Sequence, residues 1–496
     1  MDHPFDRYAT FTDLAALKAA SERPLRKSLR VNTLKTSVDA FSGWAAGKGW
    51  QLTPVPWCPE GFFIDREDRE TALGKDLLHL LGHTYMQEAA SMLPPVLLDP
   101  QPGDEVLDMS AAPGSKTTQM AARMSCPTPT PQPPPPSGEG VQGVGAGFQE
   151  QRFMSGVILA NDVQEKRLWT LKSALHRCGT TNVIMTRKVG QYFAKHMTER
   201  FDRVLVDAPC TAQGTSRKDS DALSYCSADN IGKMAKLQRE LLEAGVHAAK
   251  VGGTIVYSTC TLTPEENEEV VRSILNKFSD QLECIDPPLD SVRQAQEDSA
   301  VVQRALGFDR ILPTARMWPH VCDVEGFFCA VLKKTAPTRA KEWVDFVRFQ
   351  EELMPQARQE EIGAILEGMY GTSFLRTGDV LFERGDHLLL ATEDVRDFRL
   401  PVVDYAVGIP FATRLDQLRL RISHELATLR GNEATMLIVD IDDAQLEELL
   451  GGRDTTCDAS VRGDCVMKYR GIAVGMGLAK EGVLKNRLPR WIVRKS

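Results

Sequence analysis

The sequence predicts an α/β protein whose central part is a doubly wound, mostly parallel sheet, preceded by a small α+β leader and followed by a β-rich module. From residue 104 onwards, short apolar runs end in polar residues and alternate with helical periodicity, which is typical of buried parallel strands joined by crossover helices. After about residue 335 this alternation is lost. The length of 496 residues exceeds one domain of about 150 residues, so several units are expected.

The elements of the leader and the central part follow from local patterns. Residues 1–100 mix helical periodicity with β-like runs at 28–33 and 61–65. We predict central strands at 105–109, 157–160, 182–185, 203–206, 254–258 and 327–332, and helices at 165–177, 230–250 and 264–277. The last helix is expected to have Thr263 as its N-cap, because Pro264 suits the first helical position and two glutamates follow it.

One segment interrupts the central part between its first helix and its second strand. Residues 126–152 are rich in proline and then in glycine, so they bury too little apolar surface to offset the entropy of ordering. We predict a disordered surface insertion there. Beyond residue 335, we predict helical character at 341–380 and strands at 379–392, 435–442, 465–468 and 471–475. The expected domains are 1–100, 101–335, 336–425 and 426–496.

The overall charge gives no sign of a polyanion partner. The formal net charge is −8, so a nucleic acid would have to be bound by local basic patches. Two such runs exist: residues 18–35 and residues 480–496 each carry six basic side chains against one acidic side chain. A solvated surface run without a partner explains such charge equally well.

The cysteines and the apolar segments indicate the compartment. Eleven cysteines are spread through the chain without a C-x-x-C pair or a Cys/His cluster, so we expect reduced thiols, a cytoplasmic location and no structural metal. The N-terminus lacks the pattern of a secretory signal, and no stretch of 18 apolar residues occurs. We therefore expect no membrane span.

Chemistry-bearing residues follow the predicted strands. Small residues at 110–115 connect the first strand to a helix, and such a turn at the carboxyl edge of a doubly wound sheet lets a ligand approach the backbone. The motif is neither a P-loop nor a dinucleotide fingerprint. Asp162 follows the second strand, where an acid commonly binds ribose hydroxyls. The alternatives are a tight turn without ligand and a helix-capping aspartate.

Two cysteines follow adjacent predicted strands. Asp207 and Cys210 come after the fourth strand and Cys260 comes after the fifth, so all three are expected at the same sheet edge as the turn. A thiolate there would be a candidate nucleophile. A single cysteine is more often a small buried hydrophobe, but the joint position of these two beside Asp207 favours chemistry.

Together, the segments 110–117, 207–210 and 258–261 resemble the motifs of the Sun-type RNA cytosine-5 methyltransferases, in the same order and at suitable spacing. Flanking segments extend the likeness at 26–33, 86–94, 217–219, 318–320 and 325–328. Residues 56–61 and 475–491 are most similar to the bacterial RsmF-type small-subunit ribosomal RNA methyltransferases, whose C-terminal module is PUA-like.

The resemblance implies a Rossmann-like class I core that uses S-adenosylmethionine, an N-terminal leader and a C-terminal PUA-like domain that bind RNA, and a monomer that methylates small-subunit ribosomal RNA without a metal. Cys260 matches the nucleophile that attacks carbon 6 of cytosine, Cys210 matches the cysteine that resolves the adduct, and Asp207 matches the residue that holds the base at N3. The matching cofactor-binding residues are Ser110, Ala111, Ala112, Pro113, Gly114, Ser115, Lys116, Asp162, Arg167 and Asp207. The basic residues expected to contact RNA are Arg26, Lys27, Arg30, Arg217, Lys218, Lys485, Arg487 and Arg490.

The sequence departs from the family pattern at two places. Val189 stands where the family usually has an aspartate that contacts the adenine amino group, and residues 211–214 read Thr-Ala-Gln-Gly where Ser-Gly-Glu-Gly is common. Losing one such hydrogen bond removes about 0.5–1.5 kcal/mol. Because the catalytic motifs are shared across the family, a transfer RNA cytosine-5 methyltransferase is kept as an alternative function. Val189 keeps open a second alternative, a non-catalytic ribosome-assembly factor.

Overall fold

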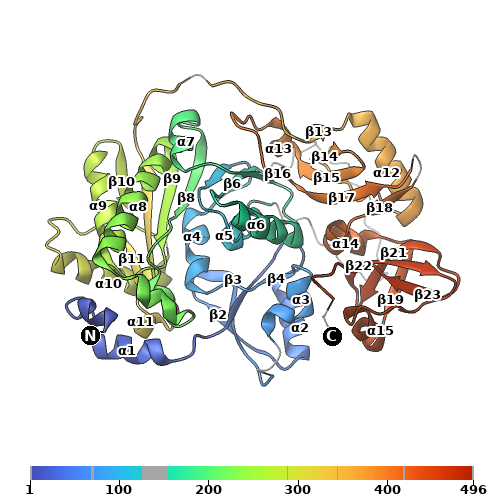
Figure 1. The fold of residues 1–496 in the computed structure, drawn as a ribbon, viewed down its shortest axis with the longest axis horizontal. Helices are drawn as coiled ribbons and strands as arrows, with labels where there is room; N and C mark the ends of the chain where they lie inside the picture. Colours follow the sequence, from blue (N-terminus) through green and yellow to red (C-terminus); the bar gives the residue numbers. More distant parts are fainter. Residues whose placement is uncertain are drawn as a thin grey trace, which may run out of the picture.

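The computed structural model describes residues 3–68, 72–125, 155–287, 289–342, 344–416 and 419–493. Within them the chain forms one large central sheet, an antiparallel sheet near the N-terminus and two C-terminal sheets. Figure 1 shows the large sheet with helices on both faces and the two C-terminal sheets side by side, in orange and red. The predicted insertion at 126–152 lies outside the described residues.

The central sheet is doubly wound, as predicted, and it is mixed. Its strand order is β10-β12-β9-β8-β5-β6-β7-β16. The parallel strands are β5 (Glu105–Asp108), β6 (Val157–Asn161), β7 (Val183–Thr186), β8 (Phe201–Asp207) and β9 (Ala249–Thr259). Strand β12 (Phe327–Lys334) runs antiparallel to β9, and β10 (Leu282–Ile285) and β11 (Ala315–Met317) each pair antiparallel with β12. The chain leaves β5 toward β6 and returns on its other side as β8, so the carboxyl end of β5 is the switch point where ligands bind in such sheets.

Helices on both faces cover this sheet with apolar side chains. They are α4 (Leu93–Leu98), α5 (Ser115–Met124), α6 (Glu165–Cys178), α7 (Gln191–His196), α8 (Ala228–Ala248), α9 (Glu268–Lys277) and α10 (Arg293–Ala305). The predicted helix at 264–277 is wrong at its start: a 3-10 turn, Pro264–Glu266, is separated from α9 by Asn267 (φ −114°, ψ −99°). Thr263 makes no capping hydrogen bond. Its hydroxyl binds the Glu266 carboxylate instead, at 2.6 Å.

The N-terminal region contributes to two places. Strands β1 (Ser28–Val31), β2 (Gln51–Val55), β3 (Cys58–Asp65) and β4 (Thr84–Tyr85) form the antiparallel sheet, with α2 (Val38–Gly47) and α3 (Leu77–Leu80) beside it. The first turn (Pro4–Tyr8) and α1 (Leu14–Glu22) pack instead near α11 (Pro319–Cys322) of the central unit, where the rings of Tyr8 and Trp318 are 5.8 Å apart.

The C-terminal region contains two five-stranded sheets. The first is formed by β13 (Glu352–Leu353), β14 (Asp379–Arg384), β15 (His387–Thr392), β17 (Ile409–Arg414) and β18 (Leu420–Ile422), with α12 (Gln356–Tyr370) and α13 (Glu393–Asp397). The second is formed by β19 (Ile438–Ile441), β20 (Thr455–Thr456), β21 (Gly463–Tyr469), β22 (Ile472–Lys480) and β23 (Val483–Asn486), with α14 (His424–Arg430) and α15 (Asp443–Leu450). The run predicted at 379–392 is thus a hairpin. Several strands were not predicted, among them β10, β11, β17, β18 and β23. Another is β16 (Ala406–Val407), which pairs with β7 and extends the central sheet.

Candidate active site

The turn after β5 is held against the ends of two strands. The backbone N–H of Ala111 donates to the carbonyl of Asn161 at 2.8 Å, and the Asn161 side chain donates to the carbonyl of Met109 at 3.1 Å. Gly114 has φ +106°, and a Cβ there would lie 3.1 Å from side chains of α6. Glycine therefore allows the turn to pack closely before α5 begins at Ser115.

Two buried carboxylates border this turn. Asp162 is 2% exposed; its Oδ1 accepts from the Gln164 N–H at 3.0 Å, whereas its Oδ2 has no hydrogen-bond donor and lies 3.3 Å from Arg167 Nη1. Asp108, which sequence reasoning missed, accepts from the Thr117 hydroxyl at 2.7 Å and has an unpartnered Oδ1. Burial raises the pKa of Asp108 to about 7. The sequence signal was the acidic last residue of an apolar strand.

Two apolar side chains flank the same edge. Val163 and Val189 follow β6 and β7 and are 52% and 56% exposed, and Arg167 donates to the carbonyl of Ala112 at 2.5 Å. A carboxylate oxygen without a hydrogen bond, such as Asp162 Oδ2, suits a ribose hydroxyl, and exposed valines suit a planar apolar ring. Carboxylates also favour a positively charged group nearby. The residues present therefore fit an adenosine ligand that carries a sulfonium.

The structure brings the two predicted cysteines together. Cys210 Sγ and Cys260 Sγ are 3.3 Å apart, and both side chains are half-buried. The hydrogen bond with Cys260 is the largest cause that raises the pKa of Cys210 well above its usual range, and burial and the Cys260 charge act in the same direction. Cys210 therefore keeps its proton, and either sulfur can donate the hydrogen bond between them.

Asp207 is fixed by two donors at this edge. Lys116 Nζ donates to its Oδ2 at 2.7 Å, and the Ser258 hydroxyl donates to its Oδ1 at 2.7 Å. Burial lowers the pKa of Lys116, but the charge and hydrogen bond of Asp207 outweigh it, so the pKa of Lys116 is raised. The site thus holds an ammonium, a carboxylate and two thiols around the carboxyl ends of β8 and β9.

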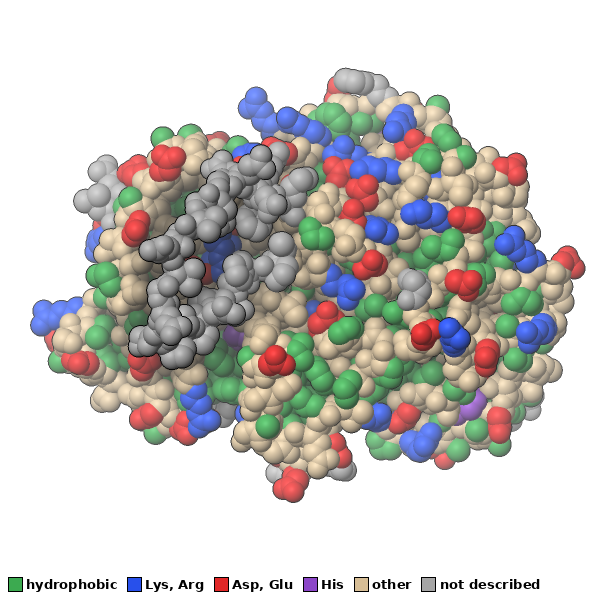
Figure 2. Space-filling view, turned by 180° about the vertical axis from the view of Figure 1, so that it is seen from behind, with side chains coloured by type: hydrophobic (Ala, Val, Ile, Leu, Met, Phe, Trp, Pro, Cys, Tyr) green, Lys and Arg blue, Asp and Glu red, His purple; other side chains and the backbone are tan. Residues whose placement is uncertain are grey.

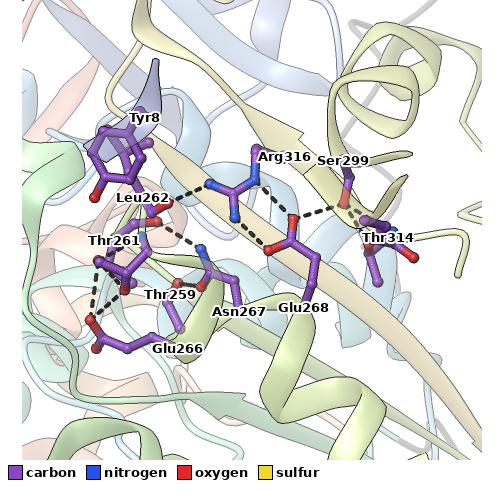
Figure 3. Close-up of polar contacts among 12 residues, drawn as sticks. Tyr8, Thr259, Thr261, Leu262, Glu266, Asn267, Glu268, Ser299, Thr314 and Arg316 are labelled. Carbon is purple, nitrogen blue, oxygen red and sulfur yellow. Dashed lines mark hydrogen bonds and ion pairs between the residues drawn. The ribbon is translucent and has the colours of Figure 1, made fainter. Parts of the chain in front are cut away.

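A buried polar network supports the Cys260 loop (Figure 3). The Asn267 side chain donates to the carbonyl of Thr261 at 3.0 Å and accepts from the Thr259 hydroxyl at 2.5 Å. Arg316 donates to the carbonyl of Leu262 at 2.7 Å and forms a fully buried ion pair with Glu268. Each residue from 259 to 263 except Cys260 itself is fully buried, so the loop holds Cys260 rigidly at the edge.

Two of the predicted RNA contacts are buried in the structure. Arg30 is 1% exposed and donates to Gln87 Oε1 and Thr118 Oγ1, both at 2.9 Å. The Arg217 side chain is 1% exposed and pairs with Asp323 at 2.9 Å. Neither guanidinium has a surface for a phosphate, so we correct these two assignments: both residues serve packing.

The other predicted RNA contacts lie at the surface. Arg26, Lys27, Lys218, Lys485 and Arg490 are exposed, and Arg487 is half-buried and lies 3.4 Å from Asp464. Figure 2 shows one face of the molecule, on which basic and acidic side chains are interspersed. The described residues contain no group of three or more His, Cys, Asp or Glu side chains suited to a metal ion. No helix among them is long and apolar enough to cross a bilayer.

Comparisons with known proteins match three segments of the chain by family model and nearly its full length by relatives. Family models match residues 8–89 (N-terminal domain of 16S rRNA methyltransferase RsmF), 149–333 (16S rRNA methyltransferase RsmB/F) and 437–494 (methyltransferase RsmF PUA domain). Ribosomal RNA small subunit methyltransferase F of Aeromonas salmonicida is 35% identical over 483 residues, which are 96% of this chain and 92% of the relative. The corresponding protein of Vibrio cholerae is 35% identical over 495 residues, with 97% and 94% covered.

Solved structures resemble part of the chain. A methyltransferase homolog protein from Pyrococcus horikoshii is 33% identical, with a TM-score of 0.51 over 66% of this chain and 93% of that one. NSun6 from the same organism is 20% identical, with a TM-score of 0.52 over 68% and 98%, and supports the fold alone. With a full-length relative at this identity and all three family models in order, the chain belongs to the ribosomal RNA small subunit methyltransferase F (RsmF) family.

Proposed function

We propose that this protein transfers a methyl group from S-adenosylmethionine to carbon 5 of a cytosine in small-subunit ribosomal RNA. The observation that carries the proposal is the 3.3 Å approach of the Cys210 and Cys260 sulfurs beside the Lys116–Asp207 pair. Carbon 5 of cytosine is a weak nucleophile, and a thiolate that adds to the neighbouring carbon splits one difficult step into easier ones.

The reaction uses the cysteines in turn. The Cys260 thiolate adds to carbon 6, which forms the Sγ–C6 bond and makes carbon 5 enamine-like. S-adenosylmethionine, when bound, would supply the electrophilic methyl group to carbon 5 and leave as the neutral thioether S-adenosylhomocysteine. A base then removes the proton from carbon 5, the C5=C6 double bond re-forms, and the Sγ–C6 bond breaks to return the Cys260 thiolate.

Cys210 is the base that we assign to the last step. While Cys260 is free, its hydrogen bond and its charge raise the pKa of Cys210. Once Cys260 is bonded to carbon 6, it no longer carries a charge, and those causes disappear. The pKa of Cys210 then falls, so its thiol releases its proton to solvent and the resulting thiolate takes the proton from carbon 5. Asp207, held by Lys116 and Ser258, binds the ring at N3 and, with the ammonium, stabilises charge that develops there.

The cofactor would be held at the switch point of the sheet. We assign Asp162 to the ribose hydroxyls, because its Oδ2 lacks a donor, and Val163 and Val189 to the adenine faces, because both are exposed there. The turn residues 110–116 and Arg167 complete the pocket. At position 189 apolar contact replaces the hydrogen bond usual in the family.

We further propose that the leader (1–100) and the C-terminal domain (426–496) bind RNA around a flipped-out cytosine, since the target carbons must enter the sheet edge. The exposed basic residues Arg26, Lys27, Lys218, Lys485 and Arg490 would meet phosphates. The protein would act as a monomer in the cytoplasm on the small ribosomal subunit or its RNA.

The test is methyl transfer in vitro, followed by mapping. The protein is incubated with tritium-labelled S-adenosylmethionine and, separately, small subunits, naked small-subunit RNA and transfer RNA, all from cells that lack the protein. We expect label at one cytosine of the small-subunit RNA, recovered as 5-methylcytosine. Label in transfer RNA alone would favour the alternative substrate, and cofactor binding without label in any RNA would favour an assembly factor.

A further inference from the structure

One buried carboxylate connects the two cysteine loops. Glu266 has no exposed surface. Its Oε2 accepts from the backbone N–H of Thr211 at 3.0 Å and from Gln238 Nε2 at 2.7 Å. Its Oε1 accepts from the Thr263 hydroxyl at 2.6 Å and from the Thr211 hydroxyl, with the Thr261 hydroxyl at 3.4 Å. All of these donors are uncharged.

The donors flank both cysteines. Thr211 directly follows Cys210, and Thr261 directly follows Cys260. Gln238, on α8, also donates to the carbonyl of Pro209 at 2.9 Å, so it joins the same carboxylate to the residue before Cys210. Four donors converge on the two oxygens: the backbone N–H and the hydroxyl of Thr211, the Gln238 amide and the Thr263 hydroxyl. This number matches the acceptor capacity of a carboxylate and exceeds that of a neutral side chain.

The charge of Glu266 also acts on the Cys210 thiol. It is one of the causes that raise the pKa of Cys210, after the hydrogen bond with Cys260, burial and the Cys260 charge. The other ionisable groups that face this pair are Tyr257 on β9, whose pKa burial raises well above its usual range, and Lys116 and Asp207 on the side of Cys260. Glu266 is the carboxylate on the side of Cys210.

We propose that Glu266 is a positioning residue that holds the two cysteine side chains next to each other and gives them different roles. Before the reaction, Cys260 accepts a hydrogen bond from Cys210. When the adduct must be resolved, Cys210 still lies beside the cytosine ring. This inference rests on the proposed function. Beyond that function, we infer that a carboxylate that does not touch the substrate determines which cysteine attacks and which one resolves the adduct.

Valine substitutions separate the two sides of the network. Thr211→Val removes a hydroxyl bond on the Cys210 side, so we expect the covalent protein–RNA adduct to accumulate about tenfold above the wild-type level at steady state. Thr263→Val removes a hydroxyl hydrogen bond on the Cys260 side, so the adduct should form about tenfold more slowly and should not accumulate. Both are measured by denaturing gel with labelled small-subunit RNA, and Thr211→Ser should restore the wild-type level.

Glu266→Gln tests the charge. The amide keeps the size and one acceptor oxygen, so peptide-resolved alkylation by iodoacetamide should show Cys210 reacting at a lower pH than in the wild type. An unchanged alkylation profile would overturn the electrostatic part of the proposal. If Thr211→Val and Thr263→Val slowed turnover with the same adduct fraction, the positioning part would be overturned.

Thr314→Val is the matched control. Thr314 is also fully buried, and its hydroxyl belongs to the adjoining Glu268–Ser299 network (Figure 3) without a bond to either cysteine loop. It should lower the thermal midpoint like the other valine variants and leave the adduct fraction at the wild-type value. If wild-type protein transfers no methyl and Cys210→Ala traps no adduct, the proposed function fails; if both behave as expected and only the threonine variants do not, the inference alone fails.

Discussion

The carboxyl edge of the central sheet and the basic run at 18–35 were both singled out in the sequence, and they behave differently in the structure. At the sheet edge Cys210, Cys260, Asp207 and Lys116 meet. In the basic run, Arg26 and Lys27 are exposed, whereas Arg30 is buried and Lys35 binds two buried acceptors. Strand topology dictates where strand ends meet, but charge in a sequence does not reveal which side chains find internal partners.

The largest effect should come from the sheet edge. Cys260→Ala should lower methyl transfer by about 10³-fold or more, because the nucleophile is lost, and it should form no covalent adduct. Cys210→Ala should also abolish turnover but trap an adduct with RNA that survives denaturation. The measurement is label transfer together with a denaturing gel, and identical behaviour of the two variants would contradict the assigned roles.

Substitution of the exposed basic residues should weaken RNA binding and leave protein stability unchanged. For the quadruple variant of Lys27, Lys218, Lys485 and Arg490 to alanine, the slope of log affinity against log salt should fall by about 0.7–0.9 for each lost phosphate contact. Filter binding of small-subunit RNA across a salt series measures it. An unchanged slope would remove these residues from the interface.

Arg30 should affect stability instead. Arg30→Met leaves Gln87 and Thr118 without their donor, which should lower the free energy of unfolding by about 2–4 kcal/mol. The control is Arg26→Met: its exposed guanidinium lies 3.9 Å from the centre of the Phe63 ring, a contact that contributes about 0.5–1 kcal/mol. Urea unfolding of both variants measures the difference, and equal losses would contradict the distinction.

Lys35 should make stability depend on pH. Burial lowers its pKa from 10.5 to about 7, and its ammonium group donates to the carbonyl of Leu81 and the hydroxyl of Thr428. Between these values the unfolded chain binds the proton more tightly, so the free energy of unfolding should rise with pH by up to about 1.4 kcal/mol per unit. Relative to Lys35→Met, the wild type should gain stability from pH 7.5 to 9, by about 1–2 kcal/mol. Parallel curves for the two proteins would contradict this.

The smallest effect concerns the loop after Cys210. Ala212 has φ +58°, a left-handed conformation that is unfavourable for alanine and free of strain for glycine. Ala212→Gly should therefore raise the thermal midpoint slightly, by up to about 1 kcal/mol of stability, with methyl transfer unchanged. A lower midpoint would show that the alanine methyl group contributes to packing.

Much of this molecule could be predicted from local patterns. The apolar runs predicted the strands of the central sheet because a strand buried on both faces needs such a run, and the small-residue turn at 110–114 and the residues after the fourth and fifth strands were expected at one edge. The sequence also showed that Ala212 stands where the family often has glycine. Asp108 and Glu266 were missed. For Glu266 the reason is that several glutamates follow residue 263, and nothing in the sequence indicates which of them is buried.

The sequence by itself determined the alternation of strands and helices, the order of the motifs and the chemistry of two thiols and a carboxylate at strand ends, because these depend on residue type and short-range periodicity. The tertiary structure decided which basic side chains face solvent, that β16 extends the central sheet, that residues 264–277 break at Asn267, and that Glu266 joins the two cysteine loops. Each of these depends on partners far away in the chain, whose hydrogen bonds and burial arise only when the units pack together.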